Sequence, residues 1–318
     1  MKVLANDGIS QTGVDNLKAA GFEVITDKIE QGELINYINE NNIDVVLVRS
    51  ATKVRKDIID ACPGIKIIGR GGVGMDNIDV EYARDKGIHV INTPAASSAS
   101  VAELVFAHLF GGVRFLYDAN RSMPLVGDTK FKDLKKNYAE GRELRGKTLG
   151  IIGFGRIGQE VAKIALGCGM NVITCDPLVD NATIKVEFFD EQFIEMEIFT
   201  RPLEEVLKQS DFISIHVPSQ KNYVIGEKEI ESMKDGAGII NVARGGLIDE
   251  VALIDALESN KLSFAALDTF ENEPSPAIKV LKNDKLSLTP HIGASTKEAQ
   301  DRIGTELAEQ IKRILKAV

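Results

Sequence analysis

The sequence contains no tryptophan, three cysteines and only four histidines, which excludes several kinds of protein at the start. Cys62, Cys168 and Cys175 form no C-x-x-C pair and have no histidine at zinc-ligand spacing. We therefore predict neither a disulfide framework nor a metal site. A chain with so few cysteines suits a reducing compartment, and we expect it to be cytoplasmic.

We expect neither a signal peptide nor a membrane-spanning segment. The N-terminus, M-K-V-L-A-N-D-G, starts directly as a strand, without the apolar core and cleavage site of a signal peptide. The most apolar long segment, Ala99 to Tyr117, contains Glu103, His108 and Arg114 and is too short and too charged to span a bilayer. We expect His108 to serve packing or interface hydrogen bonding rather than catalysis.

The formal net charge of −9 disfavours nucleic acid and anionic membranes as partners. At 318 residues the chain exceeds the roughly 250 to 300 residues that one core supports, so two domains are expected. Short apolar runs alternate with amphipathic segments, which predicts an α/β fold of parallel sheets. The small-residue segment Asn92 to Ser100 suits a domain boundary.

Three further segments carry weaker signals. A strand is expected at Ile65 to Ile68, and the glycines of G-R-G-G-V-G-M-D-N after it suggest backbone exposed to a ligand, although an ordinary strand-to-helix loop fits too. Residues 118 to 144 are polar and aperiodic, so we expect an irregular connecting arm there. Residues 178 to 200 are rich in Glu and Phe, and nothing in the pattern assigns them a role.

The most informative stretch runs from Thr148 to Asp176. A buried, β-branched strand leads into Gly153, Gly155 and Gly158, which form G-x-G-x-x-G at the start of a helix, and a second strand ends at Asp176. The glycines permit a tight turn, close approach of a pyrophosphate and close helix packing. The carboxylate can bind a ribose diol and repels a 2′-phosphate, and no arginine follows it, so NAD is the predicted cofactor.

Four polar residues follow later apolar strands: Arg244, Asp268, Glu273 and His291. Carboxyl ends of parallel strands meet at one edge of a sheet, where ligands bind. Hydride transfer to or from an alcohol carbon needs a proton carrier, a group that tunes the carrier and a cation that orients the substrate. His291, Glu273 and Arg244 can supply these functions in that order.

Spacing alone leaves other interpretations open. Arg244 can be a surface ion-pair arginine, Glu273 a solvated loop acid and His291 a helix cap. Asp268 can instead be a turn former, and Glu271 can replace Glu273.

Four motifs together resemble the D-isomer-specific 2-hydroxyacid dehydrogenase family over nearly the whole chain: G-F-G-R-I-G, N-V-A-R-G-G-L-I-D-E, A-A-L-D-T-F-E-N-E-P and P-H-I-G-A-S-T-K-E-A. Within that family, V-R-S-A-T-K-V, G-R-G-G-V-G-M-D-N and S-T-K-E-A-Q are most similar to the D-3-phosphoglycerate dehydrogenases. The resemblance implies Arg244, Glu273 and His291 as the catalytic set, with Glu273, directly before Pro274, preferred over Glu271.

The resemblance also implies two Rossmann-like doubly wound domains with the active site in the cleft between them. The substrate domain, 1–97 plus 292–318, is discontinuous and the NAD-binding domain is 98–291. Cofactor contacts are expected at Gly153, Gly155, Arg156, Ile157, Gly158, Asp176, His216, Val217, Pro218, Val242, Ala243, Asp268, His291, Gly293 and Ala294. Substrate contacts are expected at Arg49, Ser50, Arg70, Gly71, Gly72, Val73, Arg244 and His291, with Lys53 as a further phosphate candidate.

The function implied is NAD-dependent oxidation of D-3-phosphoglycerate to 3-phosphohydroxypyruvate, the first step of serine biosynthesis. The partner is thus a small anionic 2-hydroxy or 2-oxo acid that carries a phosphate. A glyoxylate or hydroxypyruvate reductase of the same family is the alternative, and an NADH-sensing corepressor is an alternative of another class. We expect a homodimer through the apolar helix near 101–117. Since the sequence stops at Val318, feedback through a C-terminal serine-sensing domain is not expected.

Overall fold

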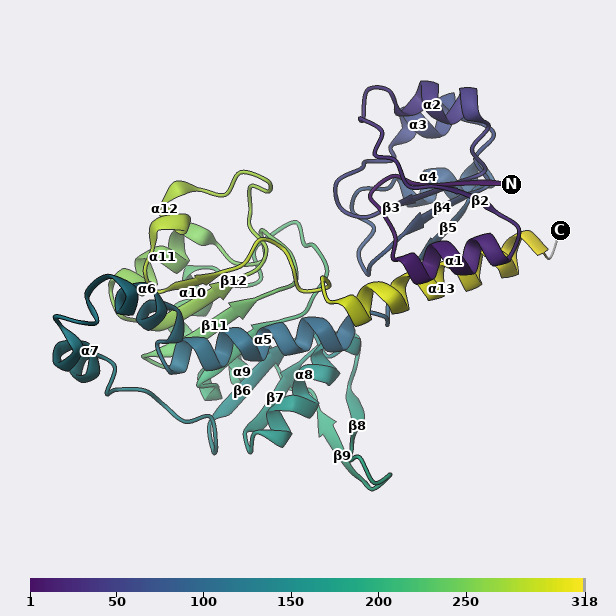
Figure 1. The fold of residues 1–318 in the computed structure, drawn as a ribbon. Helices are drawn as coiled ribbons and strands as arrows, with labels where there is room; N and C mark the ends of the chain where they lie inside the picture. Colours follow the sequence, from purple (N-terminus) through teal and green to yellow (C-terminus); the bar gives the residue numbers. More distant parts are fainter. Residues whose placement is uncertain (317–318) are drawn as a thin grey trace. The chain divides into compact units, whose positions relative to one another are not determined.

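The computed structural model describes residues 1–316, which form two compact units (Figure 1). Unit 1 comprises residues 1–100 together with the described residues from 294 on, and unit 2 comprises residues 101–293. The boundaries predicted from the sequence lie at 97/98 and 291/292. Each unit is an α/β layer structure built on a parallel sheet, so the predicted fold class is confirmed.

Unit 1 has a five-stranded sheet in the order β2-β1-β3-β4-β5. Apolar residues of α2, α3 and α4 cover one face of this sheet, and α1 and α13 cover the other (Figure 1). Helices α1 and α13 approach each other so closely that a Cβ on Gly13 would lie 2.8 Å from the Cα of Gly304. The elements are β1 Lys2–Ala5, α1 Gln11–Ala19, β2 Glu23–Ile25, α2 Leu34–Asn41, β3 Val45–Val48, α3 Lys56–Ala61, β4 Ile67–Arg70, α4 Val80–Asp85, β5 His89–Asn92 and α13 Lys297–Lys316.

The strand expected at Ile65 to Ile68 lies two residues further along the chain, at Ile67–Arg70. Gly69 therefore belongs to β4 and not to the loop. A Cβ there would lie 2.5 Å from Leu47 Cδ2 on the neighbouring strand, so this glycine serves sheet packing. The loop begins only at Gly71, and its first exposed residue is Val73.

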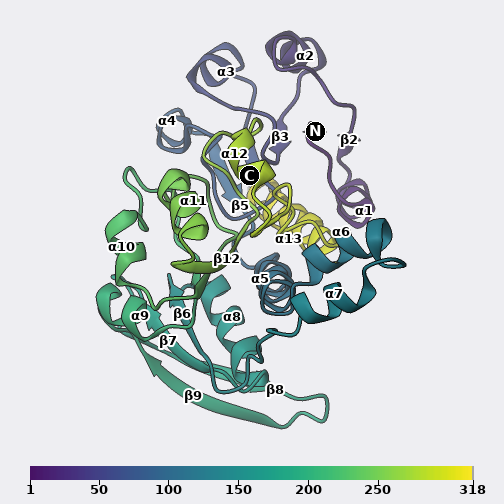
Figure 2. The ribbon, with the colours of Figure 1, turned by 90° about the vertical axis from the view of Figure 1, so that its left-hand side faces the viewer.

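Unit 2 has a six-stranded sheet in the order β13-β12-β11-β10-β6-β7, and all of its strand pairs are parallel. Helices α5 and α8 pack on one face, and α9, α10, α11 and α12 pack on the other (Figure 2). The elements are α5 Ser98–Val113, β6 Thr148–Ile152, α8 Arg156–Gly167, β7 Asn171–Cys175, α9 Leu203–Gln209, β10 Phe212–Ile215, α10 Glu227–Ser232, β11 Ala237–Asn241, α11 Glu250–Glu258, β12 Leu262–Leu267, α12 Ile278–Lys282 and β13 Leu286–Leu288.

The connecting arm expected at 118–144 is wrong in part, because two helices occupy it. Helix α6 spans Leu116–Val126 and α7 spans Phe131–Asn137. Pro124 lies in the last turn of α6, where only the end of the hydrogen-bond ladder is affected. No residue of α6 is buried, so its apolar side chains do not join the core of unit 2.

Residues 178–200, which had no predicted role, contain an antiparallel hairpin of β8 Asn181–Glu187 and β9 Phe193–Phe199. Figures 1 and 2 both show it projecting from the rest of unit 2. Ile184 is buried in the same cluster as the apolar face of α8, so the base of the hairpin packs onto the domain.

No single helix among the described residues is long and apolar enough to cross a membrane. Helices α5 and α6 taken together are long and apolar enough, by length and composition only, and the chain bends by 56° between them.

Candidate active site

The strands of unit 2 all point the same way, so their carboxyl ends lie along one edge of the sheet. After β6 the chain passes to β7 on one side and later returns to β10 on the other side of β6. Ligands of such sheets bind at this switch point, outside the carboxyl ends of the strands. The predicted residues Gly153, His216, Val242 and Asp268 follow β6, β10, β11 and β12 at this edge.

The three glycines after β6 meet the demands of a pyrophosphate cradle. Gly153 has φ +94°, and a Cβ there would lie 2.5 Å from the His216 carbonyl oxygen. A Cβ on Gly158 would lie 2.2 Å from the Gly153 carbonyl oxygen, so the helix can pack onto the turn only without a side chain. Gly155, the N-cap of α8, faces open space, with no atom of residues 1–316 within 4 Å of an added Cβ. The residues therefore fit NAD, whose pyrophosphate would lie over Gly155 at the N-terminus of α8.

Asp176, at the end of β7, is held in place by two backbone groups. Its Oδ2 accepts a hydrogen bond from Phe154 N at 2.7 Å, and its Oδ1 accepts one from Leu178 N at 2.8 Å. Each carboxylate oxygen has a second lone pair that can accept a ribose hydroxyl. The carboxylate is thus fixed beside the glycine turn, where the sequence predicts the ribose contact.

A cavity of about 1040 Å³ adjoins Asp176 and extends along the carboxyl ends of β6, β7 and β10. It is large enough for an adenosine, since ligand pockets commonly measure about 300 to 1,000 Å³. Arg201, which the sequence analysis did not single out, also lines it, because the hairpin returns the chain to this edge. Its guanidinium lies 3.8 Å from Glu205.

His216 directly follows β10, and its ring Nδ1 is buried. Its Nε2 lies 2.8 Å from Ser214 Oγ, and Nδ1 has no hydrogen-bond partner among the described residues. Burial lowers the pKa of His216 to about 3, so the ring is neutral near pH 7. Val217, next in the chain, lines the adenosine-sized cavity.

His291 and Glu273 meet, as the sequence predicts for an acid–base pair. The His291 Nδ1 lies 2.9 Å from Glu273 Oε2, and both side chains are about one-third exposed, at 37% and 36%. Glu273 is held in turn, because its Oε1 accepts a hydrogen bond from Phe270 N at 3.0 Å. His291 has φ +55°, a conformation that a non-glycine residue seldom adopts and that is concentrated at functional sites.

Asp268 fixes the loop that carries His291. The carboxylate is fully buried and accepts hydrogen bonds from Thr289 Oγ1 at 2.6 Å, from Ile292 N at 2.8 Å and from Gly293 N at 2.9 Å. In the structure Asp268 organises this loop, which is close to the role of turn former that the sequence left open. Its predicted cofactor contact stays a prediction.

Arg244 lies on the neighbouring loop, after β11. Asn241 shapes this loop by donating from Nδ2 to the Arg244 carbonyl at 2.7 Å and accepting from Ala243 N at 3.0 Å. The Arg244 guanidinium donates to the Ala243 carbonyl at 2.6 Å. The structure therefore places Arg244 at the same sheet edge as the His291–Glu273 pair, and its role toward substrate remains a prediction.

His108 is a packing residue in this structure, as expected. It is buried on α5, with Nδ1 2.8 Å from Ser287 Oγ and Nε2 3.1 Å from Thr289 Oγ1. Burial lowers its pKa, so the neutral ring bridges α5 and β13.

The predicted substrate residues of unit 1 lie at the carboxyl edge of its own sheet. Arg49 follows β3, and Arg70 ends the adjacent strand β4. Arg70 Nε donates to the Arg49 carbonyl oxygen at 3.3 Å, so the two residues are neighbours. Arg49 and Ser50 line a cavity of about 470 Å³ that also includes Lys28. Gly71, Gly72 and Val73 follow Arg70, and Ala294 belongs to unit 1 as well.

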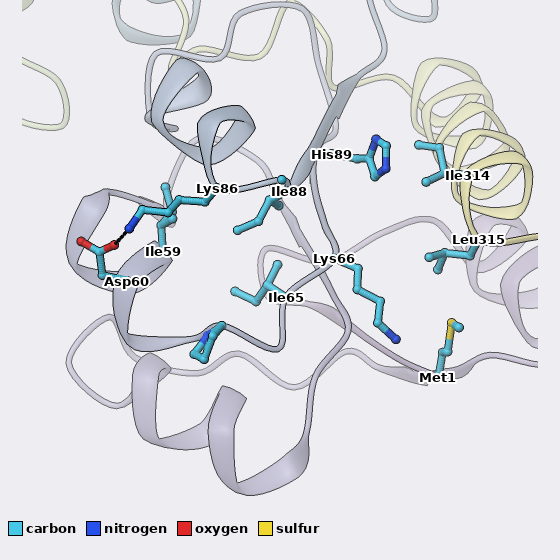
Figure 3. Close-up of a pocket in the computed structure, with 12 residues that line it drawn as sticks. Met1, Ile59, Asp60, Ile65, Lys66, Lys86, Ile88, His89, Ile314 and Leu315 are labelled. Atoms are coloured by element: carbon cyan, nitrogen blue, oxygen red, sulfur yellow. Dashed lines mark ion pairs between the residues drawn. The ribbon is translucent and has the colours of Figure 1, made fainter. Parts of the chain in front are cut away.

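A second cavity of unit 1, of about 450 Å³, lies at the opposite edge of that sheet, where β4 and β5 begin. Figure 3 shows Ile59, Ile65 and Ile88 around it, with Lys86 ion-paired to Asp60 at 2.8 Å. None of the predicted site residues lines it.

Comparison with known proteins gives this architecture a family. Residues 106–293 match the NAD-binding domain of the D-isomer specific 2-hydroxyacid dehydrogenases. The chain belongs to this family, as its motifs predict, and unit 2 is its NAD-binding domain, so the predicted NAD cofactor is confirmed. The chain is an NAD-dependent D-2-hydroxyacid dehydrogenase.

Three relatives illustrate the range within the family. The chain is 46% identical to a hydroxypyruvate reductase of Thermotoga maritima, over 91% of this chain and 90% of that one. It is 42% identical to a D-3-phosphoglycerate dehydrogenase of Methanocaldococcus jannaschii, over 99% of this chain but 58% of the relative's length. A D-lactate dehydrogenase from Aquifex aeolicus, solved with NAD and lactic acid, superposes with a TM-score of 0.75 at 29% identity, covering 100% of this chain and 96% of that one.

Proposed function

We propose that this dehydrogenase oxidises D-3-phosphoglycerate to 3-phosphohydroxypyruvate with NAD, the entry step of serine biosynthesis. The observation that carries this proposal is the pairing of Arg49 and Arg70 at the carboxyl edge of the unit 1 sheet. Arginine side chains from neighbouring positions of this edge suit a phosphate dianion, because each guanidinium presents planar, charged donors to its oxygens. The length-wide similarity to phosphoglycerate dehydrogenases supports the same substrate.

The chemistry we propose for unit 2 uses its own side chains in defined roles. Arg244 holds the substrate carboxylate with its guanidinium fork. The Glu273 carboxylate holds His291 through Nδ1, which leaves Nε2 as the nitrogen that exchanges a proton with the substrate hydroxyl. Bound NAD supplies the hydride acceptor. As the C2 hydride leaves, His291 Nε2 takes the hydroxyl proton, the C2–O bond becomes a carbonyl, and Glu273 stabilises the imidazolium that results.

Arginine replacements test the substrate assignment. Arg49→Ala and Arg70→Ala should each raise the KM for 3-phosphohydroxypyruvate about tenfold or more, because each removes charge-assisted hydrogen bonds to phosphate. The KM for hydroxypyruvate, which has no phosphate, should change by less than about twofold. Arg55→Ala is the matched control, since Arg55 pairs with Asp79 at 3.0 Å and has no proposed substrate role. Equal increases for both substrates would contradict the phosphate assignment.

Hydroxypyruvate reduction is the second candidate. The relative from Thermotoga maritima matches over 90% of its own length, whereas the chain spans 58% of the phosphoglycerate dehydrogenase from Methanocaldococcus jannaschii. The proposed roles of Arg244, Glu273 and His291 are the same for this reaction, so the unit 1 arginines distinguish the two candidates.

We also propose that the enzyme is a homodimer. Helix α5 packs its apolar side chains mainly against its own sheet, but Phe110 on it is 47% exposed. The next helices add exposed apolar side chains at Leu116, Leu125 and Phe131. Exposed apolar side chains gathered on consecutive elements mark an interaction surface. Leu125→Asp combined with Phe131→Asp should halve the mass measured by sedimentation, and a wild-type mass of one chain would contradict the proposal.

A further inference from the structure

Two glutamates outside the proposed catalytic set join the loop of Arg244 to the loop of Glu273. Glu250, at the start of α11, accepts a hydrogen bond from Glu271 N through Oε1 at 2.8 Å. Glu271 accepts one from Glu250 N through its own Oε1 at 3.1 Å. This reciprocal pairing ties the end of the 244–250 loop to residue 271, two positions before Glu273.

The two loops also touch at a second place, between Gly245 and Phe270. A Cβ on Gly245 would lie 1.8 Å from the Phe270 carbonyl oxygen, so backbone meets backbone directly beside Arg244. The amide of Phe270 donates to Glu273 Oε1, and Glu273 Oε2 meets His291 Nδ1. A continuous chain of contacts thus runs from Glu250 through the 270–271 backbone to the imidazole.

The Glu250 carboxyl is in an unusual setting for a surface-loop acid. Its residue is only 6% exposed. Burial, together with the nearby Glu271 charge, raises the pKa of Glu250. A buried carboxylate is costly unless it is hydrogen-bonded, and the Glu271 amide supplies such a bond.

We propose that Glu250 and Glu271 are positioning residues for the dehydrogenase reaction: they hold the 270–273 loop against the Arg244 loop, so that Glu273 keeps His291 in its proton-exchanging orientation. This inference rests on the roles proposed above for Glu273 and His291. Loss of the Glu250 acceptor frees the Phe270–Glu271 backbone, and Glu273 then binds the imidazole less well.

The test measures kcat and KM separately for 2-oxo acid reduction, using the 2-oxo acid that turns over fastest. Glu273→Gln should lower kcat about tenfold or more and leave KM within about threefold, because it removes the carboxylate that holds His291 for proton exchange. Glu250→Ala should lower kcat in the same way, since misplaced catalytic groups lose rate steeply. Glu250→Gln keeps an acceptor oxygen for Glu271 N and should restore kcat.

Two controls separate positioning from stability. Asp249→Ala removes the N-cap of the same helix, where Asp249 Oδ1 accepts from Val251 N and Ala252 N, without touching the 270–273 loop. It should lower the melting temperature and leave kcat within about twofold of the wild type. In a Glu273→Gln background, Glu250→Ala should lower kcat no further, because the group that it positions is already gone.

The outcomes distinguish this inference from the proposed function. A lowered kcat for Glu273→Gln together with a wild-type kcat for Glu250→Ala would overturn the positioning role alone. A wild-type kcat for Glu273→Gln would overturn the proposed acid–base pair, and the positioning role with it.

Discussion

Gly155→Ala should weaken NAD binding strongly while leaving the protein folded. The added methyl group meets no described atom within 4 Å, and φ at this position is −74°, which alanine adopts without strain. The group would, however, occupy the space over the N-terminus of α8 where the pyrophosphate binds.

The expected loss follows from the donors at the first turn of α8. If the methyl group keeps the pyrophosphate from two backbone N–H groups, two hydrogen bonds to a charged group are lost, at about 1.5 kcal/mol each. Their sum, about 3 kcal/mol, corresponds to a roughly hundredfold higher Kd. The cost to folding should be about 1 kcal/mol, because alanine is a poorer N-cap than glycine.

Fluorescence titration with NADH measures the Kd, and thermal melting measures the stability. Gly158→Ala is the contrasting variant, since its Cβ would lie 2.2 Å from the Gly153 carbonyl oxygen. That variant should lose about 2 kcal/mol or more of stability, because backbone must move to admit the methyl group. If Gly155→Ala bound NADH within about threefold of the wild type, the placement of the pyrophosphate would be refuted.

Two further predictions concern histidines. His291→Asn should leave NADH binding intact and lower kcat by about a hundredfold to ten-thousandfold, as stopped-flow or steady-state rates would show, and unchanged turnover would refute its role. His216 should destabilise the fold in acid, because burial lowers its folded pKa to about 3 from the usual histidine value near 6.5. Below about pH 6.5 the unfolded chain therefore binds a proton that the folded chain does not. The free energy of unfolding should therefore fall by about 1.4 kcal/mol per pH unit from this group, or about 2 kcal/mol at pH 5. Urea unfolding of His216→Asn and wild type at pH 7 and pH 5 checks this, because the variant should lack that part of the pH dependence.

The parts of the site that lie within one β-α-β unit could be predicted from the sequence. The tight turn and the close helix packing after β6 require glycine, and the acid follows directly from the end of β7. The meeting of Glu273 with His291 needs two strands to lie side by side, which spacing alone left open and the structure shows.

The missed features have different physical reasons. Helix α6 did carry a signal, since Leu116, Ala119, Met123 and Val126 recur at helical spacing, although none of its residues is buried. The hairpin did carry a signal, since apolar residues alternate with polar ones through Ile194, Met196 and Ile198, the period of a strand. The pairing of Glu250 with Glu271 joins side chains to backbone across two loops, and no sequence pattern encodes such a contact.

The most direct test of the account is NADH oxidation by the purified protein, followed by absorbance with 3-phosphohydroxypyruvate, hydroxypyruvate and glyoxylate side by side. We predict that kcat/KM for the phosphorylated acid exceeds the other two by about tenfold or more, because only that substrate uses the unit 1 arginines. Equal or higher values with the unphosphorylated acids would contradict the proposed substrate and favour the reductase. Failure to oxidise NADH with any of the three acids would contradict the proposed reaction itself.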